Sequence, residues 1–65
     1  MVVDKNAIEL LMARQMITQK QLSAASGVSC YTLRLVLRNK KNTSPRTIGK
    51  IAWALGVDPE AIVKG

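Results

Sequence analysis

The chain has 65 residues, of which 48% are hydrophobic, and its ten lysines and arginines outnumber its four aspartates and glutamates to give a net charge of +6. This length suits one compact domain, residues 1–65, and the positive charge favours a polyanionic partner, either nucleic acid or an anionic membrane. The chain has no histidine and a single cysteine, Cys30, so we expect no metal site, no cofactor and no enzymatic activity.

No apolar stretch approaches the roughly 18 residues that span a bilayer, and the N-terminus lacks the pattern of an export signal. A lone cysteine also fits a reducing compartment. We therefore expect a cytoplasmic protein with no membrane partner. Nothing in the sequence indicates a small-molecule effector.

Five helix starts can be recognised in chain order. Four of them place an apolar residue before a capping residue and another four positions after it, which is the hydrophobic staple: Val3-Asp4 with Ile8, Ile17-Thr18 with Leu22, Val28-Ser29 with Leu33, and Val57-Asp58 with Ile62. The fifth is Ser44-Pro45, a capping serine followed by the proline favoured at the first helical position. Gly27, Asn39 and Gly56 mark helix ends, because each tolerates a left-handed backbone. We predict an all-α fold with helices at about 4–16, 18–26, 29–38, 44–55 and 58–63.

The charges are distributed unevenly along these helices. The four acidic residues lie near the chain ends, whereas residues 10–57 hold eight basic residues and no acidic one: Arg14, Lys20, Arg34, Arg38, Lys40, Lys41, Arg46 and Lys50. A solvated surface usually mixes both signs, so we interpret this stretch as a nucleic-acid-binding surface.

The second and third predicted helices form a unit around Gly27. Ser23, Ala24 and Ser26 are small enough to let two steeply crossing helices approach, and Gly27 can take the positive φ of the turn between them. The helical period turns Leu22, Val28, Leu33 and Val36 inward. It leaves Cys30, Tyr31, Arg34 and Leu35 on the outer face of the second helix of the pair.

These features resemble the lambda-repressor/Cro type (XRE family) of helix-turn-helix transcriptional regulators. The resemblance covers nearly the whole chain: the leading helix from Ile8 to Gln15, the opening Thr18-Gln19, the turn Gly27-Val28-Ser29, Leu33, Val36, and the closing Ile51-Ala52-Trp53-Ala54-Leu55-Gly56-Val57. The stretch from Gly27 to Thr47 also resembles the LacI-type headpiece. That type lacks an equivalent leading helix, so we prefer the first family.

The resemblance implies a compact five-helix, lambda-repressor-like domain that binds double-stranded DNA with its helix-turn-helix. It suggests a bacterial or phage-encoded regulator, a small phage-like or mobile-element repressor that binds an inverted-repeat operator as a homodimer. The positions that face base edges are Cys30, Tyr31, Arg34 and Leu35. The positions expected at phosphates or the adjoining minor groove are Gln19, Lys20, Thr32, Arg38, Lys40, Lys41, Asn42 and Arg46.

Two departures from the family pattern stand out. Many members carry a buried ion pair where this chain has Met12 and Leu37, and an apolar pair there can be neutral or stabilising. The outer helix opens with Cys30 and Tyr31 instead of the Gln, Ser or Arg common in the family. We therefore expect few direct hydrogen bonds to bases and more readout of thymine methyl groups and DNA shape.

Several alternatives remain open at the sequence level. Trp53 lies off the apolar stripe of its helix, so it either belongs to a dimer interface with Ile62 and Val63 or packs against the first or last helix. An antitoxin-type module that binds both DNA and a partner protein would use the same fold. Cys30 is either a small groove-facing residue or a redox-sensing thiol. Tyr31 either enters the groove or lies back along its helix.

Overall fold

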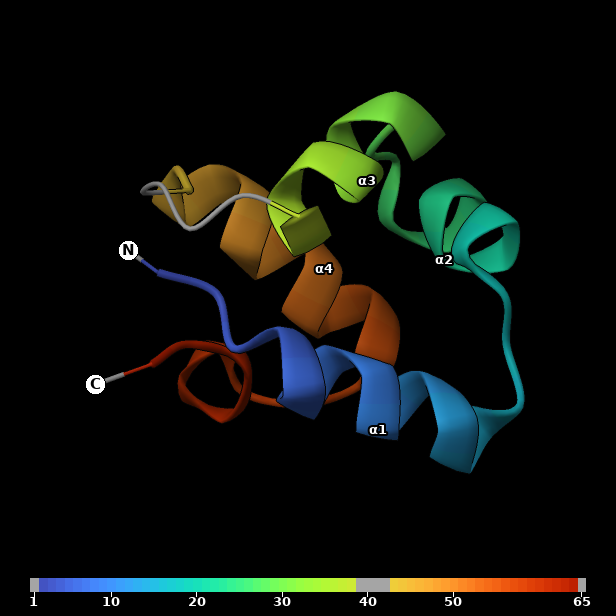
Figure 1. Cartoon of the computed structure of the whole chain (residues 1–65), viewed down its shortest axis with the longest axis horizontal. Coiled ribbons are helices and arrows are strands. Elements are labelled where there is room, and N and C mark those ends of the chain that lie inside the picture. Colours follow the sequence, from blue (N-terminus) through green and yellow to red (C-terminus); the bar gives the residue numbers. More distant parts are fainter. Residues whose placement is uncertain (1, 39–42, 65) are drawn as a thin grey trace.

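The computed structural model describes residues 2–38 and 43–64. Four α-helices, α1 (Lys5–Gln15), α2 (Gln19–Ser26), α3 (Cys30–Arg38) and α4 (Pro45–Leu55), are followed by the 3₁₀ helix η1 (Pro59–Ile62). In Figure 1, α2, α3 and the start of α4 form one side of the molecule, and α1 and η1 form the opposite side. The predicted all-helical class is confirmed. Three predicted DNA-contacting residues, Lys40, Lys41 and Asn42, lie outside the described residues.

None of the helices in the described part of the chain is both long enough and apolar enough to cross a membrane.

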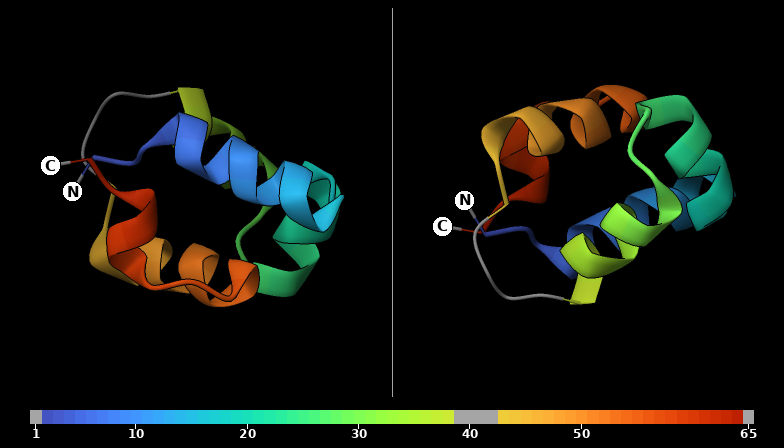
Figure 2. Two further views of the ribbon diagram at one scale, coloured as in Figure 1. Left: turned by 90° about the horizontal axis from the view of Figure 1, so that it is seen from below. Right: turned by 90° about the horizontal axis from the view of Figure 1, so that it is seen from above.

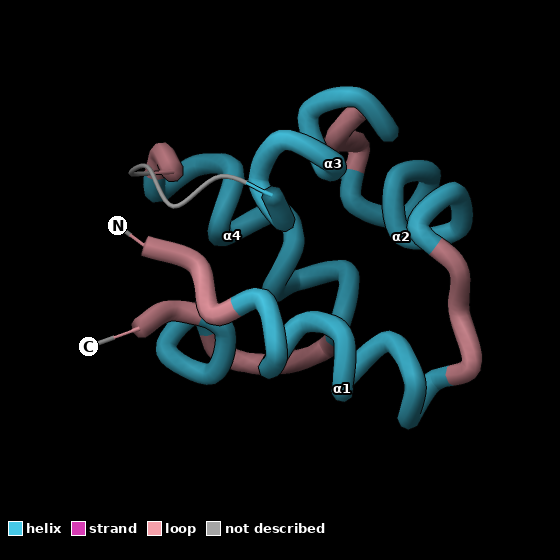
Figure 3. Tube along the Cα trace, in the orientation of Figure 1, coloured by secondary structure: helices cyan, strands magenta, loops and turns pink. Residues whose placement is uncertain are grey.

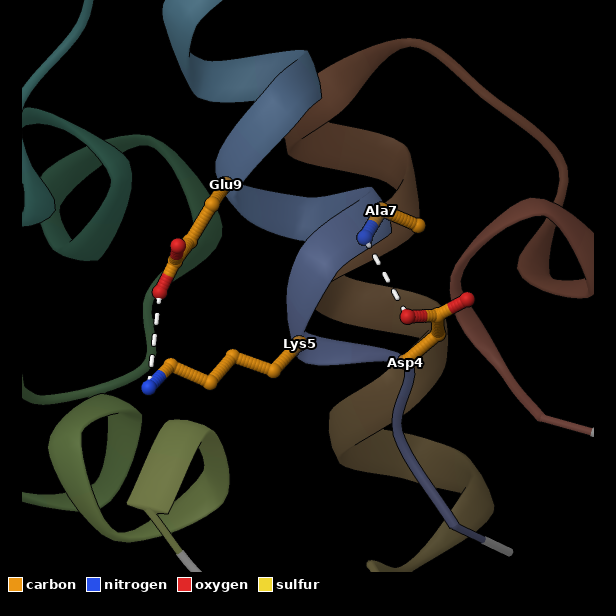
Figure 4. Close-up of polar contacts among 4 residues, drawn as sticks. All are labelled: Asp4, Lys5, Ala7 and Glu9. Carbon is orange, nitrogen blue, oxygen red and sulfur yellow. Dashed lines mark hydrogen bonds and ion pairs between the residues drawn. The ribbon is translucent and has the colours of Figure 1, made fainter.

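Side-chain caps fix the starts of α1, α2 and α4 at the predicted positions. The Asp4 carboxylate accepts the Ala7 N–H at 3.3 Å (Figure 4), and the Ser44 hydroxyl accepts the Thr47 N–H at 3.3 Å. Thr18 forms a complete capping box, in which its hydroxyl accepts the Gln21 N–H at 3.1 Å and the Gln21 side chain accepts the Thr18 N–H at 2.8 Å. Each bond satisfies a backbone group that the first turn of a helix leaves unpaired.

Helices α2 and α4 end at the predicted glycines. Gly27 and Gly56 take the left-handed conformation, with φ of 75° and 71°. The first helix was predicted to run through Met16, but α1 ends at Gln15 and Met16 takes the left-handed conformation itself, with φ of 55°. A methionine is unusual there, because a side chain makes this backbone conformation costly.

The predicted fifth α-helix at 58–63 is wrong. The segment Pro59–Ile62 is a single 3₁₀ turn, and the Asp58 side chain makes no capping hydrogen bond. The chain then becomes extended at Val63, which pairs antiparallel with Val3. The Asp4 N–H donates to the Ile62 carbonyl at 2.7 Å, and the Lys64 N–H donates to the Val2 carbonyl at 2.8 Å. The N-terminal and C-terminal segments that pair in this way lie near each other in Figures 2 and 3, and their pairing accounts for the end of the helix after four residues.

The core is aliphatic and draws on every helix. Its largest fully buried side chains are Ile8, Leu22, Leu33, Ile48, Ile51 and Ile62. The four residues predicted to face inward from the second and third helices are all buried. At the positions of the family's ion pair, Leu37 is buried and Met12 packs against the core. Two apolar side chains therefore occupy the positions of the family's ion pair, and neither places a charged group in the core.

Candidate nucleic-acid interface

The first helix of the candidate unit, α2, opens onto solvent. Gln19 and Lys20 occupy its first two positions, and both are exposed. The capping box at Thr18 holds the preceding backbone in place. A helix N-terminus with free backbone N–H groups attracts anions, and a lysine in its first turn strengthens that attraction.

The turn between α2 and α3 is fixed by two serine hydroxyls as well as by Gly27. The Ser23 hydroxyl donates to the Val28 carbonyl at 2.5 Å. The Ser26 hydroxyl accepts the Val28 N–H at 3.2 Å and donates to the Ser23 carbonyl at 3.4 Å. The small size of these serines predicts close helix packing, whereas their hydrogen bonds to the turn are seen only in the structure. The available signal was the serine pair flanking a glycine turn, where hydroxyls readily bond to local backbone.

The start of α3 is capped by Ser29. Its hydroxyl accepts the Thr32 N–H at 3.1 Å and donates to the Thr32 hydroxyl oxygen at 2.9 Å, and its carbonyl accepts the Leu33 N–H at 2.8 Å. Thr32, a predicted phosphate contact, is partly buried and engaged in this cap. Its hydroxyl can still donate a hydrogen bond of its own.

The outer face of α3 carries the side chains predicted to contact bases. Tyr31 is 68% exposed and Leu35 is 42% exposed, Arg34 is exposed, and Cys30 is partly buried. The alternative in which Tyr31 lies back against neighbouring side chains does not fit that exposure. The opposite face buries Leu33, Val36 and Leu37 in the core, which fixes the rotation of α3 about its own axis. An α-helix with its side chains is about 10–12 Å in diameter, so α3 fits the major groove of B-DNA, which is about 12 Å wide.

Acidic residues are confined to one side of the molecule, where Lys5, Arg14 and Lys64 accompany them. The four acidic residues belong to α1 and η1 or to their caps: Asp4, Glu9, Asp58 and Glu60. The helices α2, α3 and α4 contain exposed basic residues and no acidic one: Lys20, Arg34, Arg38, Arg46 and Lys50. Arg38 is the last residue of α3 and Arg46 lies in the first turn of α4, the next helix along the chain.

The three residues predicted at a dimer interface differ in accessibility. Trp53 is 77% exposed, which fits a surface available to a partner better than packing against the first or last helix. It lines an open hollow of about 790 Å³ with Val57 and Ala61. Val63 is partly buried, whereas Ile62 is fully buried in the core. Ile62 therefore cannot serve as an interface residue while the chain keeps this fold.

Two short helices joined by a hydrogen-bonded turn, with the outer face of the second helix exposed and its inner face buried in the core, have the arrangement of the helix-turn-helix class. A family model described as helix-turn-helix matches residues 8–62. The chain belongs to this family, of the lambda-repressor/Cro (XRE) type. Its fold is that of a DNA-binding regulator. No curated protein and no solved structure matches the chain significantly.

Proposed function

We propose that this protein is a sequence-specific transcriptional repressor of the small phage-like or mobile-element kind, which places α3 in the major groove of double-stranded DNA. The exposed face of α3, rigidly held on the basic side of the molecule, is the observation that carries the proposal. Because the opposite face of α3 is buried, the direction in which its outer side chains point is set by the fold.

Base recognition comes from four residues of this face. Arg34 is the hydrogen-bonding member and is suited to the two acceptors of a guanine edge. Tyr31 and Leu35 present apolar surface to thymine methyl groups, and Cys30 is a small residue that lets the start of α3 approach the bases. A site with this composition recognises apolar features and DNA shape more than donor and acceptor patterns.

Phosphate contacts surround that face. Gln19 and Lys20 bind phosphate at the start of α2, Thr32 and Arg38 flank the outer face of α3, and Arg46 acts from the first turn of α4. Lys40, Lys41 and Asn42 extend the same set on the basis of sequence alone. These contacts fix the position of the protein on the duplex without distinguishing sequences.

The repressor acts as a homodimer on an inverted-repeat operator. One recognition helix contacts only a few base pairs, and a two-fold dimer doubles the recognised sequence. Exposure of Trp53, which lines an open hollow with Val57 and Ala61, supports a protein contact there, and Val63 is kept as a second candidate because it is only partly buried. An antitoxin-type partner would use the same tryptophan, and the stoichiometry of the DNA complex distinguishes the two.

Selection of bound sites from random duplex DNA tests the proposal. We expect an enriched inverted repeat with half-site centres about 10 base pairs apart, or a multiple of one helical turn. Enrichment of a single asymmetric half-site would contradict the dimer, and failure to enrich any sequence would contradict sequence-specific regulation.

A further inference from the structure

A second feature of the molecule lies away from the outer face of α3. A cavity of about 420 Å³ opens where the N-terminal segment passes the end of α3. This volume falls within the usual range for small-molecule sites. It is far more enclosed than the open hollow beside Trp53.

The walls of this cavity combine an apolar floor with a positive rim. Its apolar lining is the partly exposed Val2 and the edges of the nearly buried Val3, Val36 and Leu37, with Asn6 beside them. Lys5, Arg38 and Lys64 also line it, and they come from α1, α3 and the C-terminal segment. No carboxylate is among the residues that line it in the described part of the chain.

One of the three cations has a weak partner. The Lys5 Nζ lies 3.7 Å from the Glu9 Oε1, with both side chains more than half exposed (Figure 4). An exposed pair of this kind contributes little, so a ligand carboxylate can replace Glu9 at low cost.

We propose that this cavity binds a small organic anion, namely a carboxylate with a short unbranched aliphatic chain. The chain contacts Val3, Val36 and Leu37, and the carboxylate lies among Lys5, Arg38 and Lys64. Three cations from separate elements line the cavity, and among the described residues the one carboxylate paired with any of them is the exposed Glu9, which is not itself a lining residue, so a neutral or cationic amphiphile fits the cavity poorly.

Such a ligand would also affect DNA binding. This consequence rests on the proposed function, because Arg38 is one of the proposed phosphate contacts. A bound carboxylate neutralises part of the Arg38 charge at the end of α3. The anion and DNA therefore compete, and saturating ligand lowers the affinity for duplex DNA.

The binding claim is tested without DNA. Backbone amide shifts of the full chain, recorded by NMR, are followed during titration with octanoate below its micelle concentration. Acetate provides the head group alone, octylamine provides the chain with the opposite charge, and inorganic phosphate provides a compact anion. We expect saturable octanoate shifts centred on Val3, Val36, Leu37 and Lys64, and at least about tenfold weaker binding of the other three probes.

Charge variants locate the site. The double variant Lys5→Gln and Lys64→Gln removes two exposed cations from the rim and should weaken octanoate binding about five- to tenfold, with an unchanged thermal unfolding midpoint. Lys50→Gln removes an exposed lysine that does not line the cavity, so it should leave octanoate binding unchanged.

Binding of octylamine or phosphate with the same affinity as octanoate would overturn the proposal. So would an equal loss of octanoate affinity in the Lys5→Gln and Lys64→Gln double variant and in the Lys50→Gln control. If octanoate binds as expected but leaves the affinity for DNA unchanged, the proposal that the cavity binds an anion is supported and the proposed competition with DNA at Arg38 is wrong. If no duplex DNA binds at all, the octanoate titration still decides the cavity claim.

Discussion

At the scale of single residues, Met16 is the position where side chain and backbone disagree most. It follows α1 in the left-handed conformation and is 87% exposed, so its side chain gains little from burial. Glycine adopts this conformation without steric cost and is the usual residue at such a helix end. We predict that Met16→Gly raises the free energy of unfolding by about 0.5–1 kcal/mol.

Chemical denaturation of the purified protein measures this change. Gln15→Gly is the matched control, because the same substitution one residue earlier falls inside α1 and should destabilise the fold by about 0.5–1 kcal/mol. A loss of stability in Met16→Gly as large as in the control would show that the left-handed conformation is not strained.

Tyr31 is the residue whose side chain most directly tests base recognition. Its exposure on α3 predicts that Tyr31→Ala leaves the core intact while reducing discrimination by about 1–3 kcal/mol at one or two base pairs. The affinities for the selected site, for its single-base variants and for random duplex DNA give this value, and circular dichroism verifies the fold.

Arg46→Gln serves as the contrasting variant. Arg46 is exposed in the first turn of α4, and loss of a phosphate contact should weaken all sequences alike and flatten the salt slope by about one unit. If Tyr31→Ala instead weakens binding to every sequence equally, Tyr31 contacts the DNA backbone and the orientation of α3 in the groove must be revised.

At the scale of elements, the turn between α2 and α3 sets the position of the recognition helix. The 2.5 Å bond from the Ser23 hydroxyl to the Val28 carbonyl closes this turn across five residues. We predict that Ser23→Ala costs about 1 kcal/mol of stability and weakens binding to all DNA sequences, because α3 is then held less firmly.

Ser29→Ala is informative beside it, because Ser29 caps α3 from the exposed side. It should cost a similar free energy of unfolding, about 1 kcal/mol, through loss of a cap. Thermal unfolding and DNA titration of both variants provide the comparison. Full DNA affinity in Ser23→Ala would mean that the hydroxyl bond does not position α3.

The elements also show which features a sequence can predict. The starts of α1 to α4 depend on local chemistry, namely the caps at Asp4, Thr18, Ser29 and Ser44, and the sequence predicts them nearly to the residue. The same is true of the ends of α2 and α4 at glycines, whereas the predicted end at Asn39 lies outside the described residues. The sequence does not predict the end of the chain, because η1 is decided by a distant pairing between Val3 and Val63. No local pattern reports that contact.

The same limit applies to the candidate sites. The helical period correctly separated the inner and outer faces of α3. The helical period does not distinguish an apolar residue that packs in the core of its own chain from one that packs against a partner. The sequence therefore predicts Ile62 at an interface, although Ile62 is buried in the core. Trp53 was recognised because it lies off the stripe formed by Ile48, Ile51 and Leu55.

At the scale of the whole molecule, Trp53 lines a hollow with residues of the η1 segment and with none of α3, which predicts separate surfaces for assembly and DNA binding. We expect two copies on the selected site. Trp53→Glu should abolish the second copy and leave the affinity of one copy for a half-site unchanged, because it adds a charge to an apolar contact away from α3.

Sedimentation of protein–DNA complexes measures the stoichiometry, and Leu10→Glu, which alters another exposed apolar residue on α1, is the control that should keep two copies. One wild-type copy on the full inverted repeat, or two copies of the Trp53→Glu variant, would refute this assembly.

The uneven distribution of charge is the other property of the whole molecule. The basic side formed by α2, α3 and α4 should neutralise about five or six phosphates per subunit. The single most direct test of the account is the salt dependence of affinity, measured in parallel on the selected site and on random duplex DNA. We predict that log K falls against log salt with a slope of about −5 per subunit on both, and that the selected site binds at least about 10³-fold more tightly. A slope near zero, or equal affinity for both DNAs, would contradict it.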